Sequence, residues 1–383
     1  MWDDGLAPAF PGLTTDVRAD TCVVGLGATG LCAVLEARAL GHTVVGIDAT
    51  VTAGGAAGAN GGILRAGLSK FHHEAVAAFG PTRAAELYRR TAAEIDRIAT
   101  ETPDAVRRTG SLRVATDDAE WADCLAQLAA MRAGGIAVEE RNTPSGRGIF
   151  VPHDAVVQPL LRGRSLARMA SERGVQLFEH TPALRFSAGN VTTPGGRISC
   201  DAIVIAVDGG LEEVVPSLAG RVRTTRLQML ATEPAADVTI PCPVSANYGF
   251  DYFQQPTDGR IALGGGRNRS FDTEWGAAAE PSDGIQAYLD GVLRDRIRTK
   301  AAVTHRWGAR VAYTTDGLPV LEQVAPNVWA TGAYNGTGNL MGALCGRAAA
   351  QLALGRQSEF HALLHPAVSA SSAQVSAKSA SSQ

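Results

Sequence analysis

The sequence predicts an α/β protein in which a Rossmann-type nucleotide-binding domain is joined to a second, mainly antiparallel β-sheet domain. A βαβ unit occupies residues 20–48, a β-rich stretch occupies about 222–318, and a strand, a glycine turn and a helix follow over 327–354. Because a chain of 383 residues exceeds the usual size of one domain, two domains are expected.

The βαβ unit carries a glycine pattern at its strand-to-helix turn. An apolar strand over 20–24 runs into Gly25-Leu-Gly27-Ala-Thr-Gly30, a helix follows, and a second apolar strand ends at Asp48. The first glycine permits a tight turn, the second lets a diphosphate approach, and the third lets the helix pack closely on the strand. We expect a dinucleotide here, with Asp48 accepting from ribose hydroxyls; a glycine-rich turn without a ligand is the alternative.

The next segments alternate between loop, helix and strand patterns. Residues 53–62 are too rich in glycine for a stable helix or strand, which predicts a backbone-lined loop against a flat ligand. Helical periodicity follows over 74–102 and 119–132, with a strand over 110–115 between them.

The second half of the chain first completes the parallel sheet and then changes character. A helix over 159–172 and a strand over 175–179 precede residues 202–207, whose apolar run predicts a central parallel strand. Turn signals and short strands over 222–318 predict the antiparallel domain. A strand over 327–331, the glycine turn 332–338 and a helix over 339–354 then return to the nucleotide-binding architecture.

These patterns divide the chain into three parts. The expected cofactor domain is discontinuous and comprises 17–75, 150–215 and 320–366; the substrate domain comprises 76–149 and 216–319; and 367–383 form a tail of low complexity that should be disordered.

Charge and composition exclude several classes of function. The 35 basic residues nearly balance the 38 acidic ones, so neither a nucleic acid nor an anionic membrane is an expected partner. No apolar stretch is long enough to span a membrane, and the acidic start lacks signal-peptide features, so a cytoplasmic protein is expected. No CxxC pair occurs among the six cysteines, and adjacent His72 and His73 point apart on a helix, so no metal site is expected.

Only one dinucleotide fingerprint is present. Residues 264–266 end a strand without a following helical pattern, and the turn 332–338 lacks an acid at the next strand end. One nucleotide cofactor should therefore serve the fold, and the electrons should come from the substrate.

Taken in order, these motifs resemble the FAD-dependent amine and amino-acid oxidases of the D-amino acid oxidase superfamily, the group of glycine oxidase, sarcosine oxidase and the gamma-glutamylputrescine oxidases. The N-terminal lead from Trp2 to about Leu13 looks most like the putrescine-oxidase branch. The segments that carry the resemblance are 25–30, Asp48, 60–62, 252–255, 259–265, 307–308, 315–319 and 332–338.

The resemblance implies a Rossmann-type FAD-binding domain with the FAD diphosphate at the glycine turn, the ribose at Asp48 and the adenine after Pro182. The N-terminus of the last helix would lie against the N1 and C2-carbonyl edge of the flavin, where free N–H groups stabilise negative charge. The expected FAD-contacting residues are Gly25, Gly27, Ala28, Thr29, Gly30, Asp48, Ala49, Gly55, Ala56, Ala57, Asn60, Gly61, Gly62, Ala183, Val207, Gly332, Asn335, Gly336, Thr337, Gly338, Asn339 and Leu340.

Two departures from the family pattern concern the cofactor. Ala57 and Ala59 replace the usual Ser and Arg of the first flavin loop, so binding should depend more on backbone donors. The chain has no cysteine between Cys242 and Cys345 that could bond the flavin, so FAD should be noncovalent unless His72 or His73 provides the link.

A third departure concerns the substrate. Leu340 and Met341 replace the lysine that contacts the substrate carboxylate in sarcosine oxidases. This favours an amine without an obligatory α-carboxylate, such as a polyamine derivative, unless Arg310 or Arg65 compensates, because a buried unpaired carboxylate is costly.

Four residues are candidates for the substrate side. Arg310 lies near the position of the carboxylate-binding arginine of glycine oxidase, but pairing with a neighbouring acid is an equal alternative. Arg65 follows the flavin loop and is a second anion partner. Tyr252 and Trp307 either face the flavin as walls of the site or pack the interdomain core, which is the default for such aromatics.

The predicted reaction is the FAD-dependent oxidation of the C–N bond of a primary or secondary amine, or of an amino acid, to an imine. Dioxygen would be the electron acceptor and give hydrogen peroxide. A dehydrogenase with another acceptor and a non-catalytic flavin-binding protein remain the alternatives. The sequence predicts neither the exact substrate nor the oligomeric state.

Overall fold

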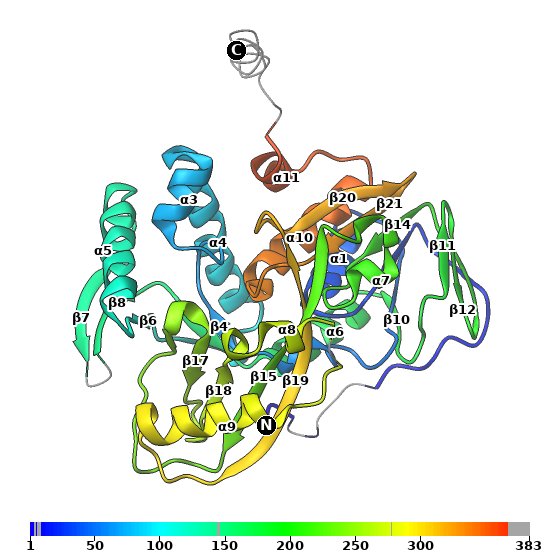
Figure 1. Cartoon of the computed structure of the whole chain (residues 1–383). Helices are drawn as coiled ribbons and strands as arrows, with labels where there is room; N and C mark the ends of the chain where they lie inside the picture. The colour runs from blue at the N-terminus through cyan, green and yellow to red at the C-terminus, as the bar shows by residue number, and fades with distance from the viewer. Residues whose placement is uncertain (4, 6–8, 144–145, 277, 367–383) are drawn as a thin grey trace.

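Two large β-sheets with helices packed around them form the computed structural model (Figure 1). It describes residues 1–3, 5, 9–143, 146–276 and 278–366. The predicted tail at 367–383 lies outside these residues. Among the helices of the described residues, none combines the length and the apolar composition that crossing a membrane requires.

The first sheet has six strands in the order β10-β3-β2-β14-β21-β20. All neighbours are parallel except β20 and β21, and β14 is central and fully buried, as its apolar run predicted. The strands are β2 (Thr21–Val24), β3 (Val44–Ile47), β10 (Gln176–Phe178), β14 (Ala202–Ile205), β20 (Val320–Ala325) and β21 (Val328–Gly332).

Different elements cover the two faces of this sheet. On one face, Val23 and Val204 pack with the helices α1 (Ala28–Ala39), α6 (Pro159–Glu172) and α10 (Gly338–Ala353). The opposite face packs on a small four-stranded sheet and on α7. These elements are β1 (Val17–Arg18), β11 (Arg185–Ser187), β12 (Asn190–Thr193), β13 (Gly196–Ser199) and α7 (Leu211–Val214). The helix α11 (Glu359–Leu364) lies next to α10.

The second sheet has eight strands in the order β19-β15-β18-β17-β16-β6-β8-β7. All neighbours are antiparallel except β16 and β6, so the predicted fold class is confirmed. The strands are β6 (Ser111–Val114), β7 (Glu139–Thr143), β8 (Gly146–Val151), β15 (Val222–Thr232), β16 (Val244–Ala246), β17 (Asp251–Gln254), β18 (Ala262–Gly265) and β19 (Val303–Thr314).

Helices also interrupt the β-rich region, which the sequence patterns did not predict. The helix α9 (Asp283–Gly291), continued by a π-helical turn (Val292–Ile297), lies along the second sheet (yellow in Figure 1), and Ile285 and Leu289 pack on its apolar side chains. A short helix, α8 (Phe271–Glu274), and three single 3₁₀ turns (Pro216–Leu218, Asn247–Gly249 and Arg267–Arg269) complete this part.

The remaining elements pack in a third apolar cluster around Ile95, Cys124 and Ile149. They include a small sheet in the order β4-β9-β5. These elements are β4 (Ile63–Leu64), α4 (Pro81–Glu101), a 3₁₀ turn (Pro103–Ala105), β5 (Val106–Arg108), α5 (Asp118–Ala133) and β9 (Ala155–Val157).

Two expectations about helices were wrong. The region 74–102 forms two helices, α3 (His72–Phe79) and α4, because Gly80 has a φ of 78° and Pro81 has no N–H to continue a helix. The glycine-rich stretch 53–62 contains one helical turn, α2 (Ala56–Ala59). A Cβ on Gly58 would lie 2.3 Å from the carbonyl oxygen of Ala53, so glycine permits the packing of this turn.

Candidate functional site

A cavity of about 870 Å³ lies between the two large sheets. It is lined by residues that follow β2, β3 and β14 and by residues on β15, β16, β17 and β19. The carboxyl ends of parallel strands are the usual ligand-binding edge of such sheets, and this volume is typical of small-molecule sites. Every expected FAD-contacting residue lines the cavity except Gly30, Gly62 and Gly332.

These three glycines lie behind the cavity and allow close packing. A Cβ on Gly30 would lie 1.8 Å from the carbonyl oxygen of Gly25, and one on Gly332 would lie 2.4 Å from that of Val207. A Cβ on Gly62 would lie 2.3 Å from the carbonyl oxygen of Val157. Their contribution is therefore to the shape of the turns.

The first glycine turn forms one end of the cavity. Gly25 has a φ of 97°, which disfavours other residues, whereas a Cβ on Gly27 would meet within 4 Å only the Cβ of Ala57, at 3.3 Å. Gly27 occupies the N-cap position of α1. Because it has no side chain, the first backbone N–H groups of α1 receive no side-chain cap. An open surface beside uncapped N–H groups suits a diphosphate.

Asp48 is fixed beside this turn by three hydrogen bonds. One carboxylate oxygen accepts from the backbone N–H of Leu26 at 2.8 Å, and the other accepts from the N–H and the hydroxyl of Thr50 at 2.8 and 2.9 Å. A carboxylate has further lone pairs, so Asp48 retains the capacity to accept from a ribose hydroxyl.

The stretch 53–62 is held by side chains from distant segments. The indole N–H groups of Trp307 and Trp2 donate to two of its carbonyls at 2.8 and 3.0 Å. The side-chain amide of Asn339 donates to Asn60 Oδ1 at 3.0 Å, which joins this stretch to the start of α10. The wall of the cavity formed by 53–62 is therefore fixed by residues of β19 and α10 and by Trp2.

The second glycine turn, 332–338, delivers the N-terminus of α10 to the same cavity. Ala333, Asn335 and Gly336 all have positive φ values, and the side chain of Asn335 accepts from the N–H of Thr314 at 2.9 Å. No side chain caps this terminus. Leu340 is 2% exposed and contributes packing, so stabilisation of an anion must come from the backbone amides and the helix dipole.

Comparison with known proteins identifies this arrangement. The family model described as DAO, FAD dependent oxidoreductase, matches residues 20–352. The chain belongs to this family. In this DAO-family protein, the open glycine turn, the fixed acid and the two uncapped helix ends are the groups that would hold FAD.

Curated relatives and solved structures agree with this assignment. The chain is 27% identical over 381 residues to the probable oxidoreductase OrdL of Rhizobium meliloti (strain 1021), covering 93% of this chain and 88% of the relative. It is 27% identical over 380 residues to gamma-glutamylputrescine oxidoreductase of Escherichia coli (strain K12), covering 92% and 88%. The fold of glycine oxidase from Geobacillus kaustophilus matches with a TM-score of 0.76 at 19% identity, covering 92% of this chain and 99% of that one.

Arg65 brings a positive charge to the cavity of the DAO-family protein. Its guanidinium donates to Ser245 Oγ at 3.2 Å, and no carboxylate of the described residues lies within ion-pair distance of it. Burial lowers its pKa. Burial raises the pKa of Asp154 to about 6 although Ser111 Oγ donates to this carboxyl at 2.6 Å, and the Asp154 charge acts on Arg65 without a direct ion pair.

Tyr252 lines the cavity between two glycines. A Cβ on Gly61 would lie 3.0 Å from its ring, and one on Gly264 would lie 2.5 Å away. Burial raises the pKa of the Tyr252 phenol, so this hydroxyl is protonated at neutral pH and is able to donate a hydrogen bond.

For Arg310 and Trp307, the structure shows the arrangements that the sequence left open as alternatives: an ion pair with an acid and packing in the core. Arg310 borders the cavity, but its guanidinium forms an ion pair with Glu213. Its neighbours Ala309 and Val311 also line the cavity. Trp307 does not line the cavity and packs with Trp2.

The histidines proposed as possible flavin links lie elsewhere. Neither His72 nor His73 lines the cavity; the ring of His72 packs against that of Tyr88 at 5.7 Å, and His73 lies 3.5 Å from a carboxylate oxygen of Asp123.

The cavity also contains residues that the sequence patterns missed, chiefly Arg267, Tyr313 and Asp208. Arg267 directly follows the glycine run 264–266, which was noted only as a strand end. Tyr313 precedes the Thr-Asp-Gly segment, and Asp208 follows the buried strand β14. Position at a strand end was the available signal, but the direction of each side chain depends on the tertiary fold.

Proposed function

We propose that the protein binds FAD noncovalently in the cavity and oxidises the C–N bond of an amine or amino acid to an imine, with dioxygen as the electron acceptor. The observation that carries this proposal is the continuity of the cavity, which extends from the open glycine turn at Gly27 to Arg65 and Tyr252. A dinucleotide and a small substrate therefore have adjoining places.

The residues suited to FAD are those of the two glycine turns and Asp48. The uncapped amides of α1 would bind the diphosphate, Asp48 would accept from the ribose, and the amides at the start of α10 would stabilise negative charge on the ring system. When bound, FAD supplies an acceptor for the two electrons removed from the C–N bond.

The remaining residues would bind and orient the substrate. Arg65 is suited to an anionic group of the substrate because no carboxylate of the described part of the chain pairs with it. This supports the alternative in which Arg65 takes over the role of the lysine that contacts the substrate carboxylate in sarcosine oxidases. We therefore favour an amine that carries a carboxylate. Tyr252 would donate a hydrogen bond from its protonated phenol.

The protonation state of the amine follows from the same cavity. An ammonium group in a largely apolar cavity beside Arg65 would be both desolvated and repelled, which favours the neutral amine. The neutral form has the lone pair that C–N oxidation requires. Arg65 thus has two roles in the proposal, since it attracts the carboxylate and disfavours the ammonium.

The relatives support an amine or amino-acid substrate but differ in reaction type. One curated relative is named gamma-glutamylputrescine oxidoreductase, and similar folds include a glycine oxidase and an L-proline dehydrogenase from P. horikoshii. Because these include both an oxidase and a dehydrogenase, turnover assays with and without dioxygen distinguish the proposed acceptor from the alternative.

The test combines cofactor content with turnover. The purified protein should be yellow and release FAD on denaturation. A panel of glycine, sarcosine, D-amino acids, putrescine derivatives and alkylamines is then assayed for hydrogen peroxide in air and for reduction of an artificial acceptor without oxygen. Peroxide formation supports the oxidase, acceptor-dependent turnover alone supports a dehydrogenase, and a protein that cannot be loaded with FAD contradicts the proposal.

A further inference from the structure

A second cationic side chain, Arg267, lines the cavity at a different place from Arg65. It belongs to the 3₁₀ turn that follows β18, after Gly265 and Gly266, which both have positive φ values. A Cβ on Gly265 would lie 2.1 Å from the carbonyl oxygen of Phe250, so this tight turn requires glycine. The backbone thus fixes the point from which the arginine enters the cavity.

Four aromatic rings surround the guanidinium of Arg267. Its central carbon lies 4.3 Å from the ring centroid of Tyr313, 5.1 Å from that of Phe271, 5.5 Å from that of Trp275 and 5.6 Å from that of Phe250. The rings form two edge-to-face pairs, Phe250 with Phe271 and Trp275 with Tyr313. We call these four residues the aromatic cage.

The cage holds the cation without using its hydrogen-bond donors. Aromatic faces attract the guanidinium through their π-electrons, whereas its N–H groups lie in its own plane and remain available to an oxygen anion. No carboxylate in the described ranges lies within ion-pair distance of Arg267. The site is therefore a preoriented cation that lacks a counter-ion.

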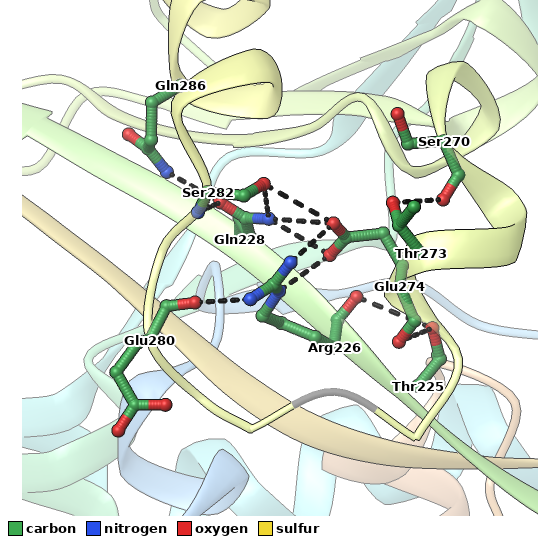
Figure 2. Close-up of polar contacts among 9 residues, drawn as sticks. All are labelled: Thr225, Arg226, Gln228, Ser270, Thr273, Glu274, Glu280, Ser282 and Gln286. Atoms are coloured by element: carbon green, nitrogen blue, oxygen red, sulfur yellow. Dashed lines mark hydrogen bonds and ion pairs between the residues drawn. The ribbon is translucent and has the colours of Figure 1, made fainter.

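A buried polar cluster fixes one wall of the cage (Figure 2). Glu274, 1% exposed, accepts from Arg226 Nε and Nη2 at 2.8 and 2.7 Å and from Gln228 Nε2 at 2.9 Å. Gln228 in turn donates to Ser282 Oγ at 2.8 Å. Glu274 directly precedes Trp275, so these bonds attach the segment that carries the wall to β15.

We propose that Arg267 binds a second anionic group of the substrate, so that the substrate is an elongated amine with two carboxylates or comparable anions. The inference rests on the proposed function, in which Arg65 binds the first. Arg65 contacts Ser245 on β16, whereas Arg267 follows β18, and β17 lies between them. The backbones of β16 and β18 are two strand spacings apart, about 10 Å, and the two guanidinium groups have different surroundings, Ser245 for Arg65 and the aromatic cage for Arg267.

The test measures binding of substrate-like anions to the FAD-loaded protein by calorimetry. Succinate, glutarate, adipate and suberate are each compared with the monocarboxylate of the same length. In the unmodified protein, at least one dicarboxylate should bind about tenfold more tightly than its partner. Arg267→Met should remove that advantage and change monocarboxylate binding by less than about twofold, and Arg267→Lys should restore part of it.

Two further variants complete the design. Arg65→Met should weaken binding of both kinds of acid. Arg223 is the matched control, because its guanidinium lies 4.4 Å from the ring centroid of Trp275 but it is exposed and does not line the cavity. Arg223→Met should change neither monocarboxylate nor dicarboxylate binding.

Three results would overturn the inference. The first is an equal loss of monocarboxylate and dicarboxylate binding in Arg267→Met. The second is a loss of the dicarboxylate advantage in Arg223→Met as large as that in Arg267→Met. The third is a changed flavin spectrum or reduction potential of ligand-free Arg267→Met, which would place the arginine on the cofactor. Because the comparison does not use amine turnover, failure of the proposed oxidation and failure of the second anion site give different results.

Discussion

At the scale of single residues, the glycines of the first turn have different tasks although they belong to one motif. Gly30 has no room for a Cβ because of the Gly25 carbonyl, whereas the surface of Gly27 faces the cavity. Gly27→Val should leave the thermal midpoint of the apoprotein nearly unchanged but abolish FAD binding, because its side chain would occupy the proposed position of the diphosphate. Gly30→Ala should lower the midpoint of the apoprotein itself.

Both effects are measured by thermal unfolding of apoprotein and by titration with FAD. Gly41→Ala is a control, because Gly41 lies outside the cavity and a Cβ there would meet nothing within 4 Å. Because Gly41 has a φ of 95°, Gly41→Ala should lower the stability modestly, and its FAD affinity should stay normal. Normal FAD affinity in Gly27→Val would show that the diphosphate lies elsewhere.

Asp208 should make FAD binding depend on pH. Burial raises its pKa to about 6 although the backbone N–H groups of Ala312 and Tyr334 donate to it at 3.3 Å. It follows Val207, which adjoins the glycine turn, so above about pH 6 its charge would repel a diphosphate. FAD affinity should rise as the pH falls from about 8 to about 5, since the complex favours the protonated form.

The variant Asp208→Asn isolates this effect. It should bind FAD at about pH 8 at least as tightly as the unmodified protein and show a flatter pH profile. Weaker binding at that pH would mean that the ionised carboxylate holds the cofactor.

The limits of sequence-based prediction at this scale are clearest for the arginines. Arg310 was a candidate because it lies near the position of the carboxylate-binding arginine of glycine oxidase, but its guanidinium pairs with Glu213, 97 positions earlier in the chain. Arg267 lies after a glycine run without a motif, and its surroundings come from residues up to 46 positions away, such as Tyr313. Spacing along the chain does not contain these contacts.

At the scale of elements, a buried ion pair joins α4 to α10. Arg347 on α10 contacts Glu94 on α4, and the two residues are 7% and 3% exposed. Arg347→Met should destabilise the protein by about 3–5 kcal/mol, because the carboxylate would remain buried without a partner. The double variant Arg347→Met with Glu94→Leu should recover most of that loss.

Thermal and denaturant unfolding of the single and double variants provide the measurement. A double variant as unstable as Arg347→Met alone would mean that packing, rather than the unpaired charge, causes the loss. The control variant Arg90→Met removes exposed ion pairs with Glu86 on the same helix and with Glu359 on α11, and it should cost less than about 1 kcal/mol.

Element boundaries followed from the sequence where a strong local signal existed. The strand β14 was predicted because of its apolar run, and the helix α5 because of its amphipathic pattern. The division between α3 and α4 was missed although Gly80 and Pro81 are a break signal, because the helical pattern on both sides was interpreted as continuous. The helix α9 was missed because its buried residues, such as Ile285 and Leu289, are too few to dominate the β-rich surroundings.

At the scale of the whole molecule, the site exists only when distant segments assemble. Strands at both ends of the chain form the six-stranded sheet, and the Asn60–Asn339 hydrogen bond joins residues 279 positions apart. The sequence predicted this arrangement because a strand, a glycine turn and a helix over 327–354 return to the nucleotide-binding pattern after the β-rich stretch. Contacts between the two sheets, which shape the substrate end, required the structure.

The central claim is that one cavity binds FAD and presents to it an amine with an anionic group. The most direct measurement is an anaerobic titration of the FAD-loaded protein with carboxylate-bearing amines and with their uncharged analogues, followed through the flavin absorbance. Bleaching by a carboxylate-bearing amine at much lower concentration than by its analogue, with this difference lost in Arg65→Met, is the expected result. Equal bleaching by both, or none by any amine, would contradict the account.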